Sequence, residues 1–155
     1  VGRPHGDDQV AWTVADRIAG GDSSQRVHKL ASPFELFAHF QPGRPTIVID
    51  ACRSGKPPGT VIRVADDQLA ELWDIAPSTH GGSVLEAIRL AEALGRKPEP
   101  LVILAVEIES TSPAAALSAA GHEGADRLER QLRAEVARLE PASPRHVAHN
   151  TNTGT

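Results

Sequence analysis

The chain has 155 residues, of which 40% are hydrophobic and 23% charged, which is ordinary for one globular domain with a core of its own. A formal net charge of −4, the lack of a basic block and an aromatic content of 3% argue against a nucleic-acid partner. The single cysteine excludes an internal disulfide, and no apolar run approaches the roughly 18 residues of a membrane span. We therefore expect a cytoplasmic protein with no membrane contact.

The first elements are a Gly/Pro-rich loop over residues 1–7 and a helix that begins at Asp8, with apolar residues at helical spacing. Gly20-Gly21 is expected to end the helix, and Asp7 or Asp8 can cap its free N–H groups. Because the chain opens on Val1-Gly2, which is typical of the end of a strand, we also expect a further strand before Val1 in the full protein.

The next segments predict a short strand over residues 27–30 and a capping box at 32–35 that starts a short helix to Phe40. The continuous apolar run of residues 46–51 predicts a central strand that is buried on both faces. Residues 60–64 alternate between apolar and polar positions, which favours an edge strand.

The second half of the chain continues the alternation of helices and apolar strands. The predicted elements are a short helix or loop over 65–77, a helix over 83–94 ended by Gly95, a buried strand over 101–106 and an amphipathic helix over 122–139. This order predicts an α/β fold, a three-layer α/β/α arrangement around a twisted, mostly parallel sheet. We expect one domain over residues 1–140 and a disordered tail over 141–155.

Polar groups stand at three junctions between strands and helices. Asp7 and Asp8 open the first helix, Asp50 ends the expected central strand, and His80 precedes the helix that starts at Ser83. Such junctions lie along one edge of an open parallel sheet, and two carboxylates with an imidazole suit a divalent metal such as Ni, Zn or Fe. Each group also has a structural interpretation: a helix cap for Asp7 or Asp8, an Asx turn for Asp50, and a surface or capping role for His80.

Other chemistry is less well supported. Cys52 with His80 could suggest a cysteine nucleophile, but Cys52 follows the strand in a loop with no helix N-terminus to lower its pKa. Ser54 and Ser78 lack the G-x-S-x-G elbow of a serine hydrolase. His5 is the histidine nearest in sequence to the proposed site, and Glu107 or Glu109 at the end of a strand could face it.

Three segments together resemble the hydrogenase maturation endopeptidases. They are Val1-Gly2-Arg3-Pro4-His5-Gly6-Asp7-Asp8-Gln9, the strand end Ile49-Asp50-Ala51 before Pro57-Pro58-Gly59-Thr60, and Ser78-Thr79-His80-Gly81-Gly82. Val106-Glu107-Ile108-Glu109 is also similar to the final-strand motif of that family. The resemblance runs from Val1 to about Leu139, and it departs from the family in having Gly-Arg-Pro-His where many members have Gly-Asn-Pro.

The resemblance implies a protease that removes a short C-terminal peptide from the large-subunit precursor of [NiFe]-hydrogenase after nickel insertion. It implies that Asp8, Asp50 and His80 contact the nickel carried by the substrate. From their positions in the chain, Asp7, His5 and Glu109 are secondary candidates. We expect the protein to be a monomer, and another divalent metal could occupy the site in vitro. Two alternatives stay open: a metal-binding or chaperone-like module that binds the same precursor without cutting it, and a small-molecule hydrolase on the same scaffold.

Overall fold

The centre of the fold is a three-stranded sheet with the order β1-β3-β2. The computed structural model describes residues 1–2, 6–20, 25–73, 83–109 and 116–139. Its strands are β1 (Thr46–Cys52), β2 (Val61–Ala65) and β3 (Leu101–Glu107). β1 runs parallel to β3, and β2 runs antiparallel to it, so β2 is the edge strand that the sequence predicted.

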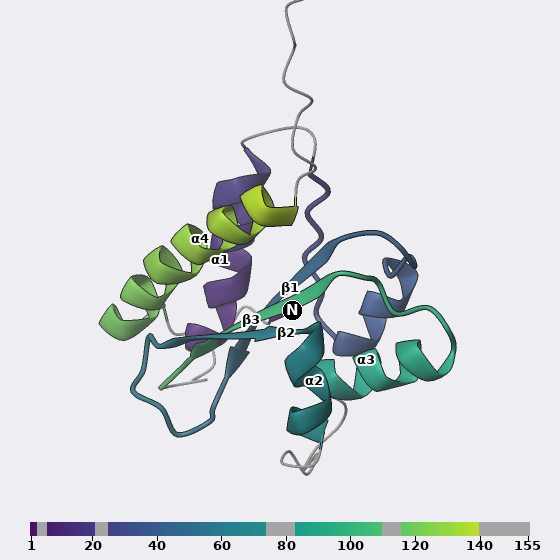
Figure 1. Cartoon of the computed structure of the whole chain (residues 1–155). Coiled ribbons are helices and arrows are strands. Elements are labelled where there is room, and N and C mark those ends of the chain that lie inside the picture. The colour runs from purple at the N-terminus through teal and green to yellow at the C-terminus, as the bar shows by residue number, and fades with distance from the viewer. Residues whose placement is uncertain (3–5, 21–24, 74–82, 110–115, 140–155) are drawn as a thin grey trace, which may run out of the picture.

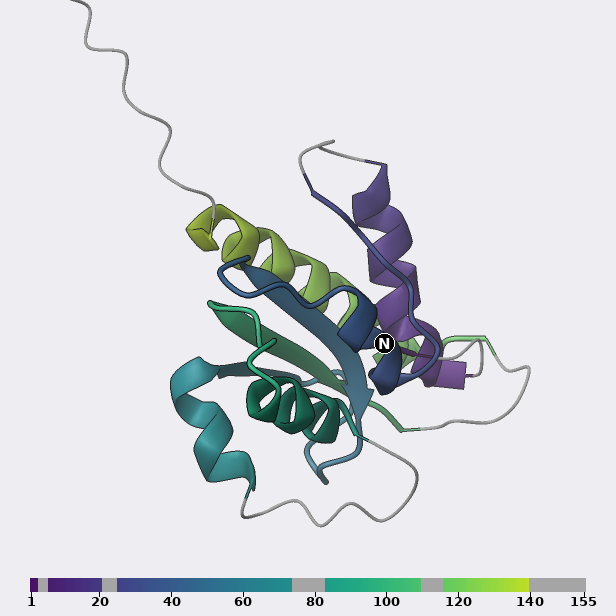
Figure 2. The ribbon, with the colours of Figure 1, turned by 90° about the vertical axis from the view of Figure 1, so that its right-hand side faces the viewer.

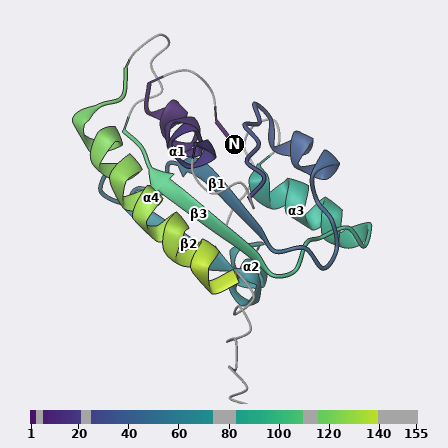
Figure 3. The same ribbon diagram turned by 90° about the horizontal axis from the view of Figure 1, so that it is seen from above.

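Helices cover both faces of this sheet, which confirms the predicted α/β/α arrangement (Figure 1). The helical elements are η1 (Gly6–Gln9), α1 (Val10–Ala19), η2 (Pro33–Ala38), α2 (Asp66–Trp73), α3 (Val84–Ala93) and α4 (Ala119–Leu139). α1 and α4 pack on one face, and η2, α2 and α3 on the other. Viewed from above, α4 runs beside β2 and β3 (Figure 3). In the described part of the chain, no helix has the length and apolar character needed to cross a bilayer.

The alternating side chains of β3 join the two layers into one core. Leu101 and Ile103 contribute to the cluster under α2 and α3, whereas Val102, Leu104 and Val106 contribute to the cluster under α1 and α4. A strand turns successive side chains to opposite faces, so a strand that is apolar throughout must be covered on both. β3 is therefore the central strand of the described sheet.

The expectation that the 46–51 strand is central and buried on both faces is wrong for the described sheet. β1 forms one edge of it, and Val48 is the one residue of β1 that is fully buried. A groove of about 830 Å³, lined by polar and apolar side chains alike, borders this edge beside Ile47, Ile49 and Ile18. An apolar run indicates that a strand is packed against other elements, but not how many strands pair with it. The strand expected before Val1 stays a prediction.

Other boundaries differ in detail. Residues 27–30 form no strand, and the backbone N–H of Gly2 donates to the Leu30 carbonyl instead. The expected helix after Ser32 is the 3-10 helix η2, which ends at Ala38. α4 begins at Ala119, three positions before the expected start at His122. The capping box expected at 32–35 is formed only in part: Ser32 caps η2 by accepting from the Phe34 N–H at 3.4 Å. A capping box that was not predicted starts α3, with Ser83 and Glu86 as its members, and Gly95 follows the helix with a φ of 65°.

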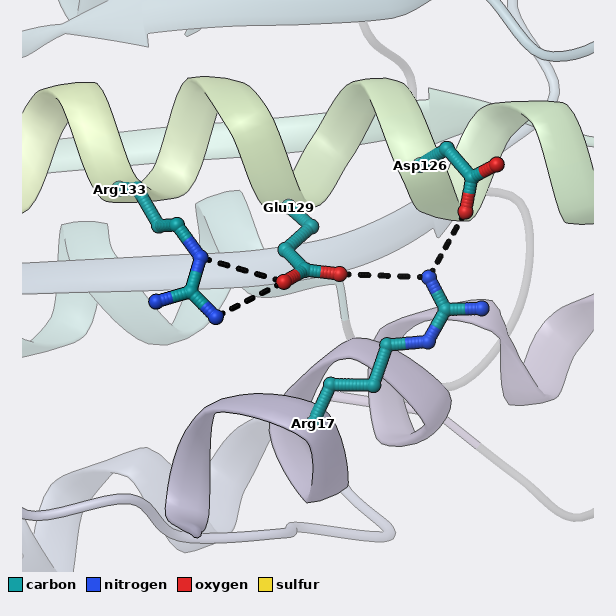
Figure 4. A network of polar contacts seen from close by, with 4 residues as sticks. All are labelled: Arg17, Asp126, Glu129 and Arg133. Carbon is teal, nitrogen blue, oxygen red and sulfur yellow. Dashed lines mark hydrogen bonds and ion pairs between the residues drawn. The ribbon is translucent and has the colours of Figure 1, made fainter. Parts of the chain in front are cut away.

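Charged side chains join the two helices of one layer to each other and to the sheet. Arg17 of α1 reaches Asp126 and Glu129 of α4 at 2.8 and 3.3 Å, and Arg133 holds the other side of Glu129 (Figure 4). Further along α4, the buried Glu135 binds Arg63 of β2 through two hydrogen bonds of 2.7 and 3.2 Å.

Candidate functional site

Asp50 lies two residues before the carboxyl end of β1, beside Ala105 of β3 in the sheet register. Its Oδ1 accepts a hydrogen bond of 3.0 Å from the backbone N–H of Ala51. Burial raises the pKa of Asp50 to about 6, and the Asp8 carboxylate adds to the rise, while the Ala51 N–H opposes it. A carboxyl group with such a pKa can take up or release a proton near neutral pH.

Asp8 approaches Asp50 from η1, the 3-10 turn that contacts β1. The backbone nitrogen of Val1 donates a hydrogen bond to the Ile49 carbonyl, next to Asp50 in β1. Figure 2 shows the amino end of the chain near the carboxyl end of β1. The structure thus brings together two of the three residues that the sequence proposed as the core of the site.

Asp7 is adjacent to Asp8 in sequence but has a different environment. Its side chain is 1% exposed and accepts hydrogen bonds from the Ser118 backbone N–H at 2.8 Å and the Ser118 hydroxyl at 3.0 Å. The Ser118 hydroxyl in turn accepts from the N–H of Gly121 in the first turn of α4. A Cβ atom on Gly121 would lie 2.4 Å from Asp7 Oδ1, so the position requires a glycine. Asp7 therefore fastens η1 to the start of α4.

Neither acid occupies the N-cap position of α1. That position belongs to Gln9, whose side chain does not cap the helix. The prediction that Asp7 or Asp8 caps the first helix is therefore wrong, because both residues lie in the 3-10 turn η1, before the N-cap of α1.

Glu107 is the last residue of β3, and local patterns in the sequence did not distinguish it from Glu109, two positions after the strand. Glu107 is 4% exposed, and its carboxylate accepts from the N–H and hydroxyl of Ser54 and from the N–H of Gly55, at 2.6 to 3.0 Å. Glu109, the residue proposed as a candidate, is exposed. Glu107 could be recognised only from its place opposite Cys52 in the β1–β3 register. That pairing joins distant segments and cannot be read from the sequence.

Two predicted site residues, His80 and His5, lie outside the described residues. Within the described ranges, no group of three or more His, Cys, Asp or Glu side chains is placed to hold a metal ion. The described part of the site is therefore the carboxylate pair Asp8 and Asp50. Carboxylate oxygens can bind a divalent metal or accept a proton from water.

Comparison with known protein families connects this arrangement to a function. The family model described as hydrogenase maturation protease (HycI) matches residues 31–133, which is more than half of the chain and includes Asp50. The chain belongs to the hydrogenase maturation protease family. It is therefore an endopeptidase of the class that the sequence motifs indicated. No curated protein matches the chain.

Solved structures support the fold of this maturation protease. The chain is similar to an endopeptidase from Escherichia coli, with a TM-score of 0.76, 19% identity and 89% of each chain covered. It is similar to the hydrogenase maturating endopeptidase HybD from E. coli, with a TM-score of 0.67, 19% identity and 86% of each chain covered. It is also similar to the [NiFe] hydrogenase maturation protease HycI from Thermococcus kodakarensis KOD1, with a TM-score of 0.63, 24% identity, and 88% and 87% of the two chains covered.

The cysteine of this maturation protease is unsuited to act as a nucleophile. Burial raises the pKa of Cys52 to about 12, and the neighbouring Glu107 carboxylate contributes to the rise. The thiol lies 3.6 Å from Glu107 Oε2, to which it is a weak donor. A nucleophilic cysteine needs a lowered pKa and hence a cationic or helix N-terminal neighbourhood. The structure thus agrees with the sequence argument against cysteine catalysis.

Proposed function

We propose that this protein removes a C-terminal peptide from the nickel-loaded large-subunit precursor of [NiFe]-hydrogenase, and that Asp8, Asp50 and His80 contact the nickel of the substrate. The observation that supports the proposal most is the approach of Asp8 to Asp50 at the carboxyl end of β1. Two carboxylates and one imidazole leave coordination positions for the precursor's own ligands.

The carboxylates have two possible tasks in peptide hydrolysis. As ligands they would hold the nickel of the precursor near the scissile bond, where the metal can polarise the carbonyl or activate water. As a base, the Asp50 carboxylate would take a proton from the attacking water and return it to the leaving amine. A pKa of about 6 for Asp50 suits the second task, because the group is ionised at neutral pH and still basic enough to accept a proton.

The proposal is tested by mixing the purified protein with nickel-loaded and nickel-free precursor and measuring the mass of the large subunit. We expect the mass to fall only for the nickel-loaded form. The variants Asp8→Asn, Asp50→Asn and His80→Gln should leave that mass unchanged. Asp16→Asn is the matched control, because Asp16 is an exposed acid paired with Lys29 on the surface.

Other outcomes would contradict the proposal. Binding of the nickel-loaded precursor with no change of mass would favour the chaperone-like alternative. Cleavage of small esters or amides without any metalloprotein would favour a small-molecule hydrolase. Cleavage of nickel-free precursor at the same rate would show that the substrate's nickel is not recognised, and normal cleavage by Asp50→Asn would remove Asp50 from the site.

A further inference from the structure

The loop that follows Asp50 is exposed, so packing in the core does not order it. All residues from Arg53 to Pro58 are exposed to solvent. A loop with few buried contacts opens easily unless its backbone groups have strong partners. Hydrogen bonds to the backbone of this loop must therefore hold it in place beside Asp50.

Glu107 binds both ends of the loop. Its side chain accepts from the N–H groups of Ser54 and Gly55, and the Ser54 hydroxyl donates to it at 2.6 Å. Its backbone pairs with the far end: the Gly59 N–H donates to the Glu107 carbonyl, and the Glu107 N–H donates to the Thr60 carbonyl, both at 2.8 Å. The loop thus closes around one residue of the neighbouring strand.

The carboxylate of Glu107 is charged and buried, and its contacts in the described chain come from N–H, O–H and S–H donors. Burial raises the pKa of Glu107, but the hydrogen bonds from Ser54, Gly55 and Cys52 outweigh burial and lower it. A buried carboxylate is costly unless such bonds are made, so the loop and the charge depend on each other.

We propose, on the basis of the function proposed above, that Glu107 is a positioning residue that orders the 53–60 loop and thereby fixes Asp50 relative to the substrate. Asp50 is joined to the loop through Ala51 and Cys52, and Cys52 pairs directly with Glu107 in the sheet register. A displacement of about 1 Å at a reacting group can lower a rate by about 100-fold. Glu107 therefore contributes to the rate without contacting the substrate.

Hydrogen exchange at backbone amides tests whether Glu107 orders the 53–60 loop. In Glu107→Ala, hydrogen exchange at the Ser54 and Gly55 amides should become at least about tenfold faster, while exchange in α4 stays unchanged. Trypsin should also cut the Arg53–Ser54 bond faster, because the Ser54 N–H no longer has its two carboxylate contacts of 2.8 and 2.9 Å. Unchanged exchange and unchanged cutting would overturn the inference.

Processing of the nickel-loaded precursor tests whether Glu107 contributes to the rate of cleavage. We expect kcat of Glu107→Ala to fall about 10- to 100-fold, with KM changed less than about threefold. Glu107→Gln keeps the size and one oxygen acceptor and should restore part of kcat. Ser54→Ala removes only the hydroxyl contact and should give a smaller loss of kcat. This variant tests the same contact if the substitutions at position 107 prevent folding. Glu35→Gln, an exposed acid on η2, is the control for loss of one charge.

The two proposals fail in different ways. If the unmodified protein leaves nickel-loaded precursor intact, the proposed function is wrong. If the unmodified protein cuts it, and Glu107→Ala loosens the loop but keeps the normal kcat, the positioning role is wrong and the proposed function stands.

Discussion

The carboxylate of Asp7 and the backbone N–H of Ser118 are hydrogen-bonded at 2.8 Å across 111 residues of sequence. The next residue, Asp8, instead lies close enough to Asp50 to help raise the pKa of that carboxyl group. Two adjacent acids that look alike in the sequence therefore have separate tasks. Asp7 connects η1 to α4, and Asp8 contributes to the candidate site.

This division predicts that substitution of Asp7 affects stability, whereas substitution of Asp8 affects activity. Asp7→Ala should lower the free energy of unfolding by about 2–3 kcal/mol, because it removes a buried carboxylate and leaves the partly buried N–H and hydroxyl of Ser118 without their acceptor. Asp8→Asn should change it by less than about 1 kcal/mol and abolish precursor processing. Urea unfolding and the mass of the precursor measure the two effects.

A second substitution tests the same contact from the other side. Gly121→Ala places a Cβ atom 2.4 Å from Asp7 Oδ1, so it should reproduce the destabilisation of Asp7→Ala. Equal losses of stability in Asp7→Ala and Asp8→Asn would contradict the separate tasks.

Asp50 is expected to cost stability at neutral pH. Its pKa is raised from 3.8 to about 6, so between these values the native state holds the proton that the unfolded chain has released. Stability from this group therefore falls as the pH rises through that window, by on the order of 3 kcal/mol. We expect Asp50→Asn to raise the free energy of unfolding at pH 7 by about 1–3 kcal/mol and to have little effect near pH 4. A loss of stability at pH 7 in urea unfolding would contradict this, and Asp67→Asn on the surface of α2 is the control.

The same ionisation predicts the pH dependence of processing. Whether Asp50 binds metal or accepts a proton, the ionised form is the active one. The value of kcat/KM should therefore decrease about tenfold per pH unit below about pH 6, the pKa of Asp50 in the free protein. The test measures kcat/KM between about pH 5 and pH 8 with nickel-loaded precursor. A flat profile across pH 6 would exclude a role for the Asp50 carboxylate.

Local patterns in the sequence were sufficient for the elements that depend on neighbouring residues. The apolar spacing over residues 83–94 and the terminating Gly95 predicted α3, and the alternation after Thr60 predicted the edge strand β2. These signals are short in range, because a cap or an alternating face is completed within a few residues.

Features that depend on pairing between distant segments could not be predicted in this way. The apolar runs of β1 and β3 look alike, and only the pairing makes β3 the central strand. The sequence placed Asp7 and Asp8 in one role, and the contact with Ser118 separates them. Glu107 faces the loop after Asp50 because Cys52 is its partner in the register, which no local pattern reports.

Cys52 should be chemically inert in the native protein. With its pKa raised to about 12 by burial and by Glu107, the thiol is almost entirely protonated at pH 8. Alkylation by iodoacetamide should be at least about 100-fold slower than in the unfolded chain. Cys52→Ser keeps a donor toward Glu107 and should process the precursor at the normal rate within about twofold. Fast alkylation, or loss of processing in Cys52→Ser, would restore the cysteine as a candidate nucleophile.

The ion pairs of α4 should differ in strength according to burial. Glu135 is 4% exposed, and its hydrogen bond to Arg63 is the main cause that lowers the pKa of the carboxyl group. The stabilisation from the Glu135 carboxylate is therefore fully present above the ordinary pKa of 4.5, and it is lost as the pH falls through the lowered pKa of the folded protein. Glu135→Ala should cost about 2–3 kcal/mol at pH 7, and less at pH 3. Arg17→Ala, at the more exposed network with Asp126, should cost less than about 1 kcal/mol and should be more sensitive to salt. Urea unfolding of both variants at low and high salt measures the contrast, and equal costs at pH 7 would contradict it.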